Sequence, residues 1–126
     1  MRCTLLSAAL TAALAFSPTP QQAPLVKRRT VADLPGYEVH TSYPEVDVSV
    51  VVPADAAAPH DAPWAVHIPG LEFSALSMVQ YAPSLDGYNL AYVCCGEDGR
   101  QSFGGLSAAV TTFVSGLDKC VLVGES

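Results

Sequence analysis

The second half of the chain alternates between two kinds of hydrophobic pattern, and this alternation limits the fold more than any other feature. Short apolar runs, typical of strands, cover residues 64–68, 88–95 and 120–123. The segments between them, residues 74–81 and 102–117, place apolar residues on one side of a helix. Strands that alternate with helices pair in parallel through right-handed crossovers. The pattern therefore predicts an α/β layered fold with a mostly parallel sheet.

The first half of the chain predicts an antiparallel N-terminal hairpin. Residues 37–43 alternate between polar and apolar side chains, and residues 46–52 are rich in β-branched valine. Each run ends at a proline, and the prolines and alanines of residues 53–63 indicate a loop.

Details of the second half give further expectations. We expect Ser74 to cap the first helix, Pro83 to end it and Gly116 to end the second helix. The unbroken apolar run at residues 120–123 predicts a strand buried on both faces. The second helix should turn a regular apolar stripe toward the sheet, formed by Phe103, Leu106, Val110, Phe113 and Leu117.

The N-terminal residues have the features of a targeting leader. Arg2 precedes an apolar run at residues 5–15 that ends in Ala-Leu-Ala, which predicts a signal peptide over residues 1–15. Residues 16–32 are rich in proline and basic residues and contain no acid, as in a transit peptide. The two parts together, with Phe16 at their junction, resemble the presequences of algae with secondary plastids. This resemblance implies plastid targeting, with secretion as the alternative, and leaves residues 33–126 as the domain.

The domain is strongly acidic. All twelve acidic residues of the chain lie from Asp33 onward, where only Arg100 and Lys119 are basic. Such a charge repels phosphate backbones, so we do not expect nucleic acid as a partner. Cys94 and Cys95 are adjacent and should point to opposite faces of a strand, which makes them a poor metal pair. We therefore expect no metal and no cofactor.

Two loops at strand ends carry the residues on which a catalytic hypothesis depends. Gly124, Glu125 and Ser126 follow an apolar strand, as the first half of a Gly-x-Ser-x-Gly nucleophile elbow does. An acyl-transfer serine also needs backbone N–H groups that stabilise the oxyanion. In the sequence HIPGLE after the earlier strand, Pro69 has no N–H, Gly70 permits close approach, and the Leu71 N–H is the expected donor. An ordinary turn at residues 70–71 is the alternative.

These segments resemble the esterase, lipase and thioesterase branch of the α/β-hydrolases. The segments VHIPGLE, EDGRQSF and CVLVGES occur in the same order as in the plastid phytyl ester synthase and diacylglycerol acyltransferase-like group. The resemblance implies acyl transfer to phytol or diacylglycerol, or hydrolysis, through an acyl-serine. It also implies a lipid or acyl-ester substrate and peripheral association with thylakoid or plastoglobule lipid, without a transmembrane helix in the mature chain.

The sequence also departs from that group. Phe73 stands where the family has glycine, and Gly99 separates the Asp-Arg pair. The triad of this fold runs in the order serine, acid, histidine, and His40, His60 and His67 all precede Ser126. We therefore expect the N-terminal part of an α/β-hydrolase fold, truncated at the nucleophile elbow and inactive by itself.

That expectation concerns the fifth strand, and two other functions are alternatives to it. The fifth strand, central in the α/β-hydrolase sheet, would here become an unprotected apolar edge. The alternatives to a plastid acyltransferase are a secreted esterase and a non-catalytic α/β fragment that binds another chain through this edge.

Overall fold

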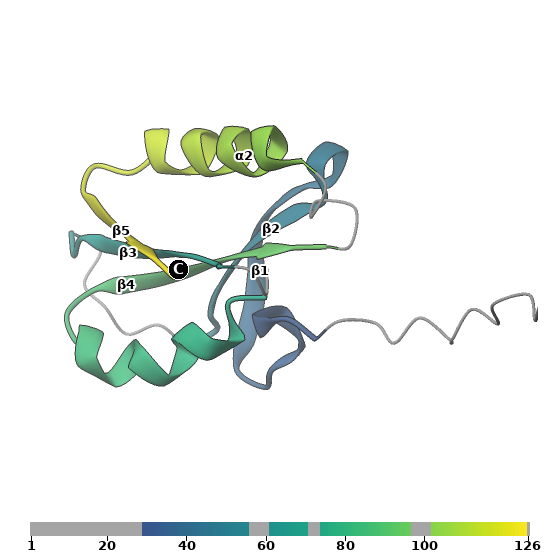
Figure 1. Ribbon diagram of the computed structural model, residues 1–126. Helices are drawn as coiled ribbons and strands as arrows, with labels where there is room; N and C mark the ends of the chain where they lie inside the picture. The colour runs from purple at the N-terminus through teal and green to yellow at the C-terminus, as the bar shows by residue number, and fades with distance from the viewer. Residues whose placement is uncertain (1–28, 56–60, 71–73, 97–101, 126) are drawn as a thin grey trace, which may run out of the picture.

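A mixed five-stranded sheet forms the centre of the protein (Figure 1). The computed structural model describes residues 29–55, 61–70, 74–96 and 102–125. The strand order is β1-β2-β4-β3-β5, in which β1, β2 and β4 pair antiparallel while β3 pairs in parallel with both β4 and β5. The prediction of an α/β fold with an antiparallel N-terminal hairpin is confirmed. The strands are β1 Tyr37–Tyr43, β2 Val48–Pro53, β3 Trp64–Ile68, β4 Asn89–Cys95 and β5 Cys120–Gly124.

Helical segments cover both faces of the sheet and give the protein three layers (Figure 1). Helix α2, Phe103–Ser115, packs on one face over alternate residues of β2 and β4. The 3₁₀ segments η1, Val31–Asp33, and η3, Leu76–Leu85, cover the other face. A third short 3₁₀ segment, η2, Pro44–Val46, joins β1 to β2. Each face of the sheet thus has its own apolar cluster.

Cys94 and Cys95 illustrate how neighbouring strand residues divide between these clusters. Cys94 belongs to the cluster under η1 and η3, and Cys95 belongs to the cluster under α2. Both are buried, as expected for adjacent residues that point to opposite faces. Burial raises the pKa of the Cys94 thiol to about 11, so this thiol is not poised as a nucleophile.

The apolar stripe of α2 packs on the sheet with one exception. Leu106, Val110 and Phe113 are buried, and Leu117 packs against the same cluster. Phe103 is 85% exposed, so its place in the stripe was predicted wrongly. It is the first residue of the helix and lies outside the cluster under α2.

The helix that we predicted at residues 74–81 differs in type and in both ends. It is a 3₁₀ helix over Leu76–Leu85 that contains Pro83, and its N-cap is Ala75 with a left-handed φ of 58°. Ser74 precedes this N-cap and is buried. Its hydroxyl accepts from the Leu76 N–H at 3.4 Å, and its carbonyl accepts hydrogen bonds from Val31 N at 3.4 Å and from Cys94 Sγ at 3.4 Å. Ser74 therefore ties η1 to β4, and the helix starts after it.

Strand β5 is an edge strand. The prediction that its apolar run is buried on both faces is wrong, because Val121 is 44% exposed and Leu122 is 54% exposed. In the described parts of the chain β5 pairs only with β3, which leaves its second edge open. The expectation of an unprotected apolar edge at this strand agrees with the observed pairing.

Candidate active site at the ends of β3 and β5

The loop after β3 meets the end of β5. Because the two strands are parallel and adjacent, their carboxyl ends lie at the same edge of the sheet, with Ile68 opposite Gly124. The Glu125 N–H donates to the Ile68 carbonyl at 3.3 Å. A Cβ atom placed on Gly70 would lie only 2.8 Å from the Glu125 carbonyl oxygen. The structure therefore brings Gly70 together with Gly124 and Glu125, as the sequence hypothesis requires.

Two of the five residues singled out by sequence lie outside the described residues. These are Ser126, the expected nucleophile, and Leu71, the expected oxyanion donor. Phe73, which departs from the family pattern, also lies there. The roles assigned to Ser126 and Leu71 remain predictions.

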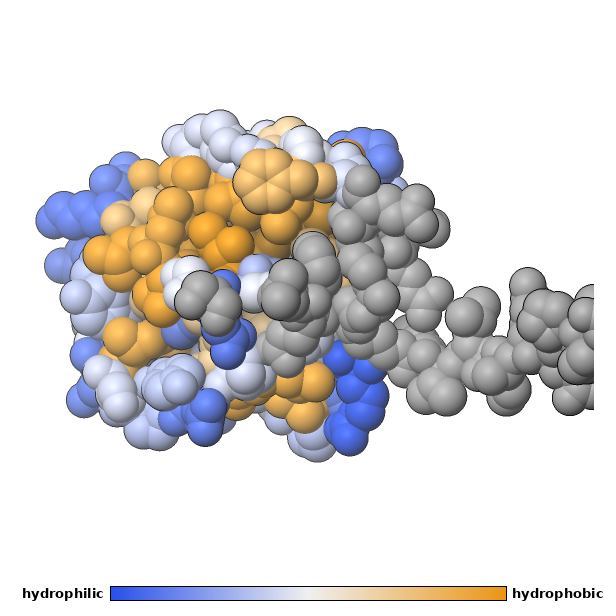
Figure 2. Space-filling model, in the orientation of Figure 1, coloured by the Kyte–Doolittle hydropathy of each residue, from blue (hydrophilic) through white to orange (hydrophobic). Residues whose placement is uncertain are grey.

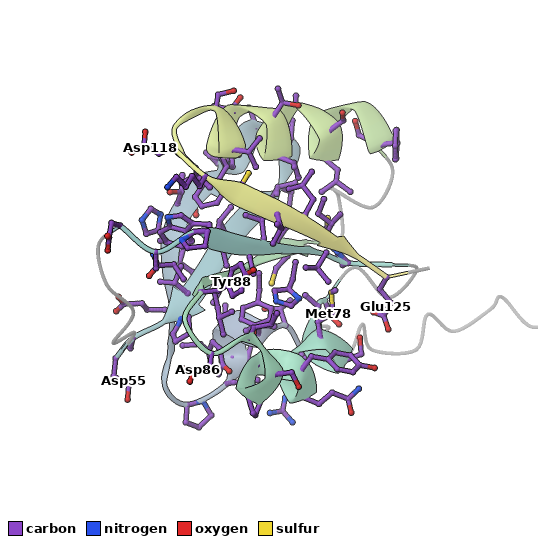
Figure 3. The ribbon with its side chains drawn as sticks, turned by 90° about the vertical axis from the view of Figure 1, so that its left-hand side faces the viewer. Asp55, Met78, Asp86, Tyr88, Asp118 and Glu125 are labelled. Atoms are coloured by element: carbon purple, nitrogen blue, oxygen red, sulfur yellow. The ribbon has the colours of Figure 1, made fainter. Side chains whose placement is uncertain are left out.

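A pocket of about 400 Å³ opens beside the end of β5. Figure 3 shows Met78 of η3 beside Glu125, which follows β5. The Ser77 hydroxyl donates to Glu125 Oε2 at 2.6 Å and so links η3 to the same strand end. This pocket can hold a largely apolar group next to one carboxylate. Its walls are Met78, Tyr81, Val123, Gly124 and Glu125.

Sequence reasoning missed the contribution of η3 to this pocket. The sequence pattern indicated only a helix with one apolar side over residues 74–81, and nothing in it singled out Ser77 or Met78. Their position depends on how η3 packs beneath β4 and β5, which no local pattern records. Tyr81 is 54% exposed, so it lines the pocket from its open side.

His67 is fully buried in β3, three residues before Gly70. Its ring stacks on Tyr92 of β4, with centroids 4.7 Å apart and an angle of 17° between the planes. Neither ring nitrogen of His67 has a hydrogen-bond partner among the described residues. Burial lowers the pKa of His67 and, together with the neighbouring Tyr37, raises that of Tyr92. His67 therefore packs inside the sheet against Tyr92, close in sequence to Gly70.

We expect His67 to make stability fall in acid. The unfolded chain binds a proton at this imidazole below pH 6.5, whereas burial opposes protonation in the folded state. The free energy of unfolding should therefore decrease as pH falls below 6.5, by at most about 1.4 kcal/mol per pH unit. In His67→Phe, which keeps an aromatic ring beside Tyr92, this contribution should disappear.

The measurement is urea unfolding of the parent and His67→Phe at pH 5 and pH 8. The loss of stability between the two pH values should be smaller in the variant, because the other titrating groups are common to both proteins. Equal losses in both proteins would show that His67 accepts a proton in the folded state.

The other two histidines do not join this site. His40 is exposed on β1, where its ring makes edge contacts with Trp64 and Phe113. His60 lies outside the described residues.

Within the described segments no three His, Cys, Asp or Glu side chains gather as a metal site. No helix in the described part of the chain is long and apolar enough to cross a bilayer.

Comparison with known proteins gives no family for the chain. It matches no protein-family model, no curated protein and no solved structure. The functional assignment therefore depends on the residues gathered at the ends of β3 and β5.

Proposed function

We propose that this chain supplies the nucleophile and the oxyanion loop of a serine acyltransferase or esterase that acts on lipid acyl esters. The fold would be the N-terminal part of an α/β-hydrolase domain. Ser126 is the nucleophile and the Leu71 N–H is one oxyanion donor. The observation that carries the proposal is the contact of Gly70 with the Glu125 backbone at the ends of two parallel strands.

Chain connectivity links this contact to the proposed chemistry. Leu71 follows Gly70 and Ser126 follows Glu125, and consecutive Cα atoms are about 3.8 Å apart. An oxyanion donor has to lie within about 3 Å of the oxygen formed when the serine attacks. The α/β-hydrolases take one such donor from the loop after the third strand, which is the position of Gly70 and Leu71. The absence of a side chain on Gly70 is what allows the two loops to meet.

The reaction itself would proceed in two steps. The Ser126 oxygen attacks the ester carbonyl carbon and loses its proton to a general base, and the alcohol or thiol of the donor leaves with a proton. Water or an acceptor alcohol then attacks the acyl-serine and releases the enzyme. Hydrolysis and transfer differ only in this second nucleophile.

The pocket beside β5 supports the proposed class of substrate. Met78, Tyr81 and Val123 give it a largely apolar wall next to Glu125. Such a wall suits the hydrocarbon part of an acyl ester better than a sugar or a phosphate. Plastid targeting, and attachment to thylakoid or plastoglobule lipid, are proposed from the leader and the resemblance alone. A secreted esterase would have the same chemistry.

A second candidate is a non-catalytic α/β domain that binds a protein partner. The observation that favours it is the open, apolar edge of β5. In that case Gly70 would approach Glu125 only to let the loop pack.

The coding sequence beyond the Ser126 codon tests the catalytic proposal. We expect glycine two residues after Ser126, with an acid and a histidine further on. The encoded product should transfer or hydrolyse long-chain acyl esters, and Ser126→Ala should reduce turnover to background while leaving the circular dichroism spectrum unchanged. A reading frame without these residues, or turnover that survives Ser126→Ala, would contradict the proposal.

A further inference from the structure

We propose that a protease removes the leader by cutting the bond between Arg29 and Thr30, and that the new α-ammonium group of Thr30 then binds the Asp33 carboxylate. The chain would thus have a processing site whose product is held by the fold. This inference goes beyond the proposed function, because it requires neither Ser126 nor the loop after β3. It rests on the leader that the sequence predicts and on the contacts of residues 29–34.

Residues 29–32, which composition places in the leader, are part of the described fold. Val31 is fully buried and belongs to the apolar cluster under η1 and η3, together with Tyr92 and Cys94. Its N–H donates to the Ser74 carbonyl at 3.4 Å. A cut after residue 32 would remove Val31 from this cluster and leave a cavity, which costs stability. A cut that preserves the cluster has to lie before Val31.

In the described part of the chain, burial begins at Thr30. Arg29 is exposed, Thr30 is partly buried and Val31 is buried, so burial rises from one residue to the next. The Thr30 hydroxyl accepts from the Ala32 N–H at 3.2 Å, and the Asp33 N–H donates to the Thr30 carbonyl at 3.0 Å. Figure 2 shows hydrophilic residues where the described chain begins in Figure 1. Thr30 is the N-cap of η1 and thus belongs to the domain.

The residues that precede Thr30 fit a protease that selects basic side chains. Residues 27–29 are Lys-Arg-Arg, and the other basic residues of the chain stand singly, at positions 2, 100 and 119. An endopeptidase with a carboxylate in its specificity pocket binds such side chains through charge-assisted hydrogen bonds. Proteolysis needs an unfolded or locally opened segment, and Val31 is docked in the folded protein. The cut therefore precedes the docking of η1.

Hydrolysis changes the charge of the Thr30 nitrogen. The oxygen of a water molecule bonds to the Arg29 carbonyl carbon, the C–N bond breaks, and the two hydrogens of the water end on the Thr30 nitrogen. The products at neutral pH are an Arg29 carboxylate and a Thr30 ammonium group. The Thr30 N–H donates to Asp33 Oδ2 at 2.8 Å in the uncut chain. The ammonium group therefore arises within hydrogen-bond distance of a carboxylate and forms a charge-assisted bond with it.

The other titratable groups around Thr30 are compatible with a cation there. Thr30 lines a pocket of about 360 Å³ together with Asp47, Cys94 and Cys95. Asp47 adds a second acidic side chain, both thiols are buried, and burial raises the pKa of the Cys94 thiol to about 11. Because folding brings the ammonium group to Asp33, it should stabilise the folded state below about pH 8, the ordinary pKa of an α-amino group, and lose this effect above it.

The first residue of the protein purified from its native cells tests the processing site. Capture with an antibody against the folded domain, followed by mass spectrometry of the N-terminal peptide, should give a chain that starts at Thr30. Any other first residue, including Met1, Phe16 or Asp33, would overturn the proposed cut. This outcome is independent of the catalytic proposal, which Ser126→Ala tests.

Two shortened chains test whether the folded domain starts at Thr30. Each is released from a cleavable fusion partner without extra residues and is unfolded in urea at pH 7. The chain that starts at Asp33 lacks Val31, so its unfolding equilibrium constant should be at least about tenfold that of the chain that starts at Thr30. If the shorter chain does not fold, Val31→Ala in the longer one should fold with a smaller loss. Equal stability of the two chains would contradict the boundary.

Acetylation of the chain that starts at Thr30 tests the ammonium group. The acetylated chain keeps the N–H that donates to Asp33 but has no charge on this nitrogen. At pH 7 the free chain should be more stable, with an unfolding equilibrium constant about threefold smaller, as expected for an exposed ion pair. The difference should disappear at pH 9.5 and in Asp33→Asn, which keeps a side-chain oxygen. Equal stability of the free and acetylated chains at pH 7 would contradict the binding of the ammonium group to Asp33.

Discussion

Replacing Phe113 by alanine should lower the free energy of unfolding by about 3–5 kcal/mol. Phe113 is buried between α2 and the sheet and makes an edge-to-face contact with Trp64 of β3, with ring centroids 6.1 Å apart. Truncation loses the transfer free energy of the ring and leaves a cavity that the surrounding strands cannot close fully. The loss is a large part of the 5–15 kcal/mol that stabilises a typical domain.

The matched control is Phe103→Ala in the same helix. Phe103 is 85% exposed, so its removal should change stability by less than about 0.5 kcal/mol. Urea unfolding followed by fluorescence measures both variants, since Trp64 is the single tryptophan and lies against Phe113. If Phe113→Ala does not fold, Phe113→Leu should fold with a smaller loss. Similar losses for the alanine variants at 103 and 113 would contradict the described packing of α2.

Replacing Gly70 by alanine should destabilise the protein by about 1–3 kcal/mol. The added Cβ would meet the Glu125 carbonyl oxygen at 2.8 Å and its carbonyl carbon at 3.3 Å. These are backbone atoms held by the pairing of β5 with β3, so the loop or the strand end has to move. Under the function proposed above, the same displacement should also lower turnover of the encoded product, because it would separate the loop after β3 from the end of β5.

Gly104→Ala is the control for this prediction. A Cβ at Gly104 would meet nothing within 4 Å, and the residue lies in the first turn of α2. Alanine is a better helix former than glycine, so this variant should gain about 0.5–1 kcal/mol. Urea midpoints of the two variants should thus move in opposite directions. A Gly70→Ala protein as stable as the parent would show that the loop does not lie against Glu125.

Local sequence patterns predicted most of the elements. β1 and β3 have the predicted bounds, and β2, β4 and β5 differ from prediction by no more than two residues. Such agreement is expected where alternation or an apolar run extends over five or more residues, because the pattern reflects which side chains face the core. The end of α2 near Gly116 was likewise predictable, since glycine there is the C-cap.

The candidate site was predictable only in part. The sequence indicated Gly70, Gly124 and Glu125 because they belong to short motifs at strand ends. It gave no indication of Ser77 or Met78, which reach the end of β5 from η3. Contacts between residues this far apart in the chain depend on how the elements pack. The periodicity of a helix shows which of its sides is apolar, but it does not show which strand or loop that side packs against.

Local residue patterns are sufficient to predict the alternation of strands and helices, the acidic charge of the domain and the glycine in the loop after β3. Long-range packing, by contrast, places β3 between β4 and β5, brings Gly70 against Glu125 and lets Ser74 link η1 to β4. The same packing leaves the Val121 and Leu122 side chains of β5 exposed, although this strand is as apolar as a buried one. Burial depends on which element lies alongside, and that neighbour is set by long-range packing and not by the residues of the strand itself.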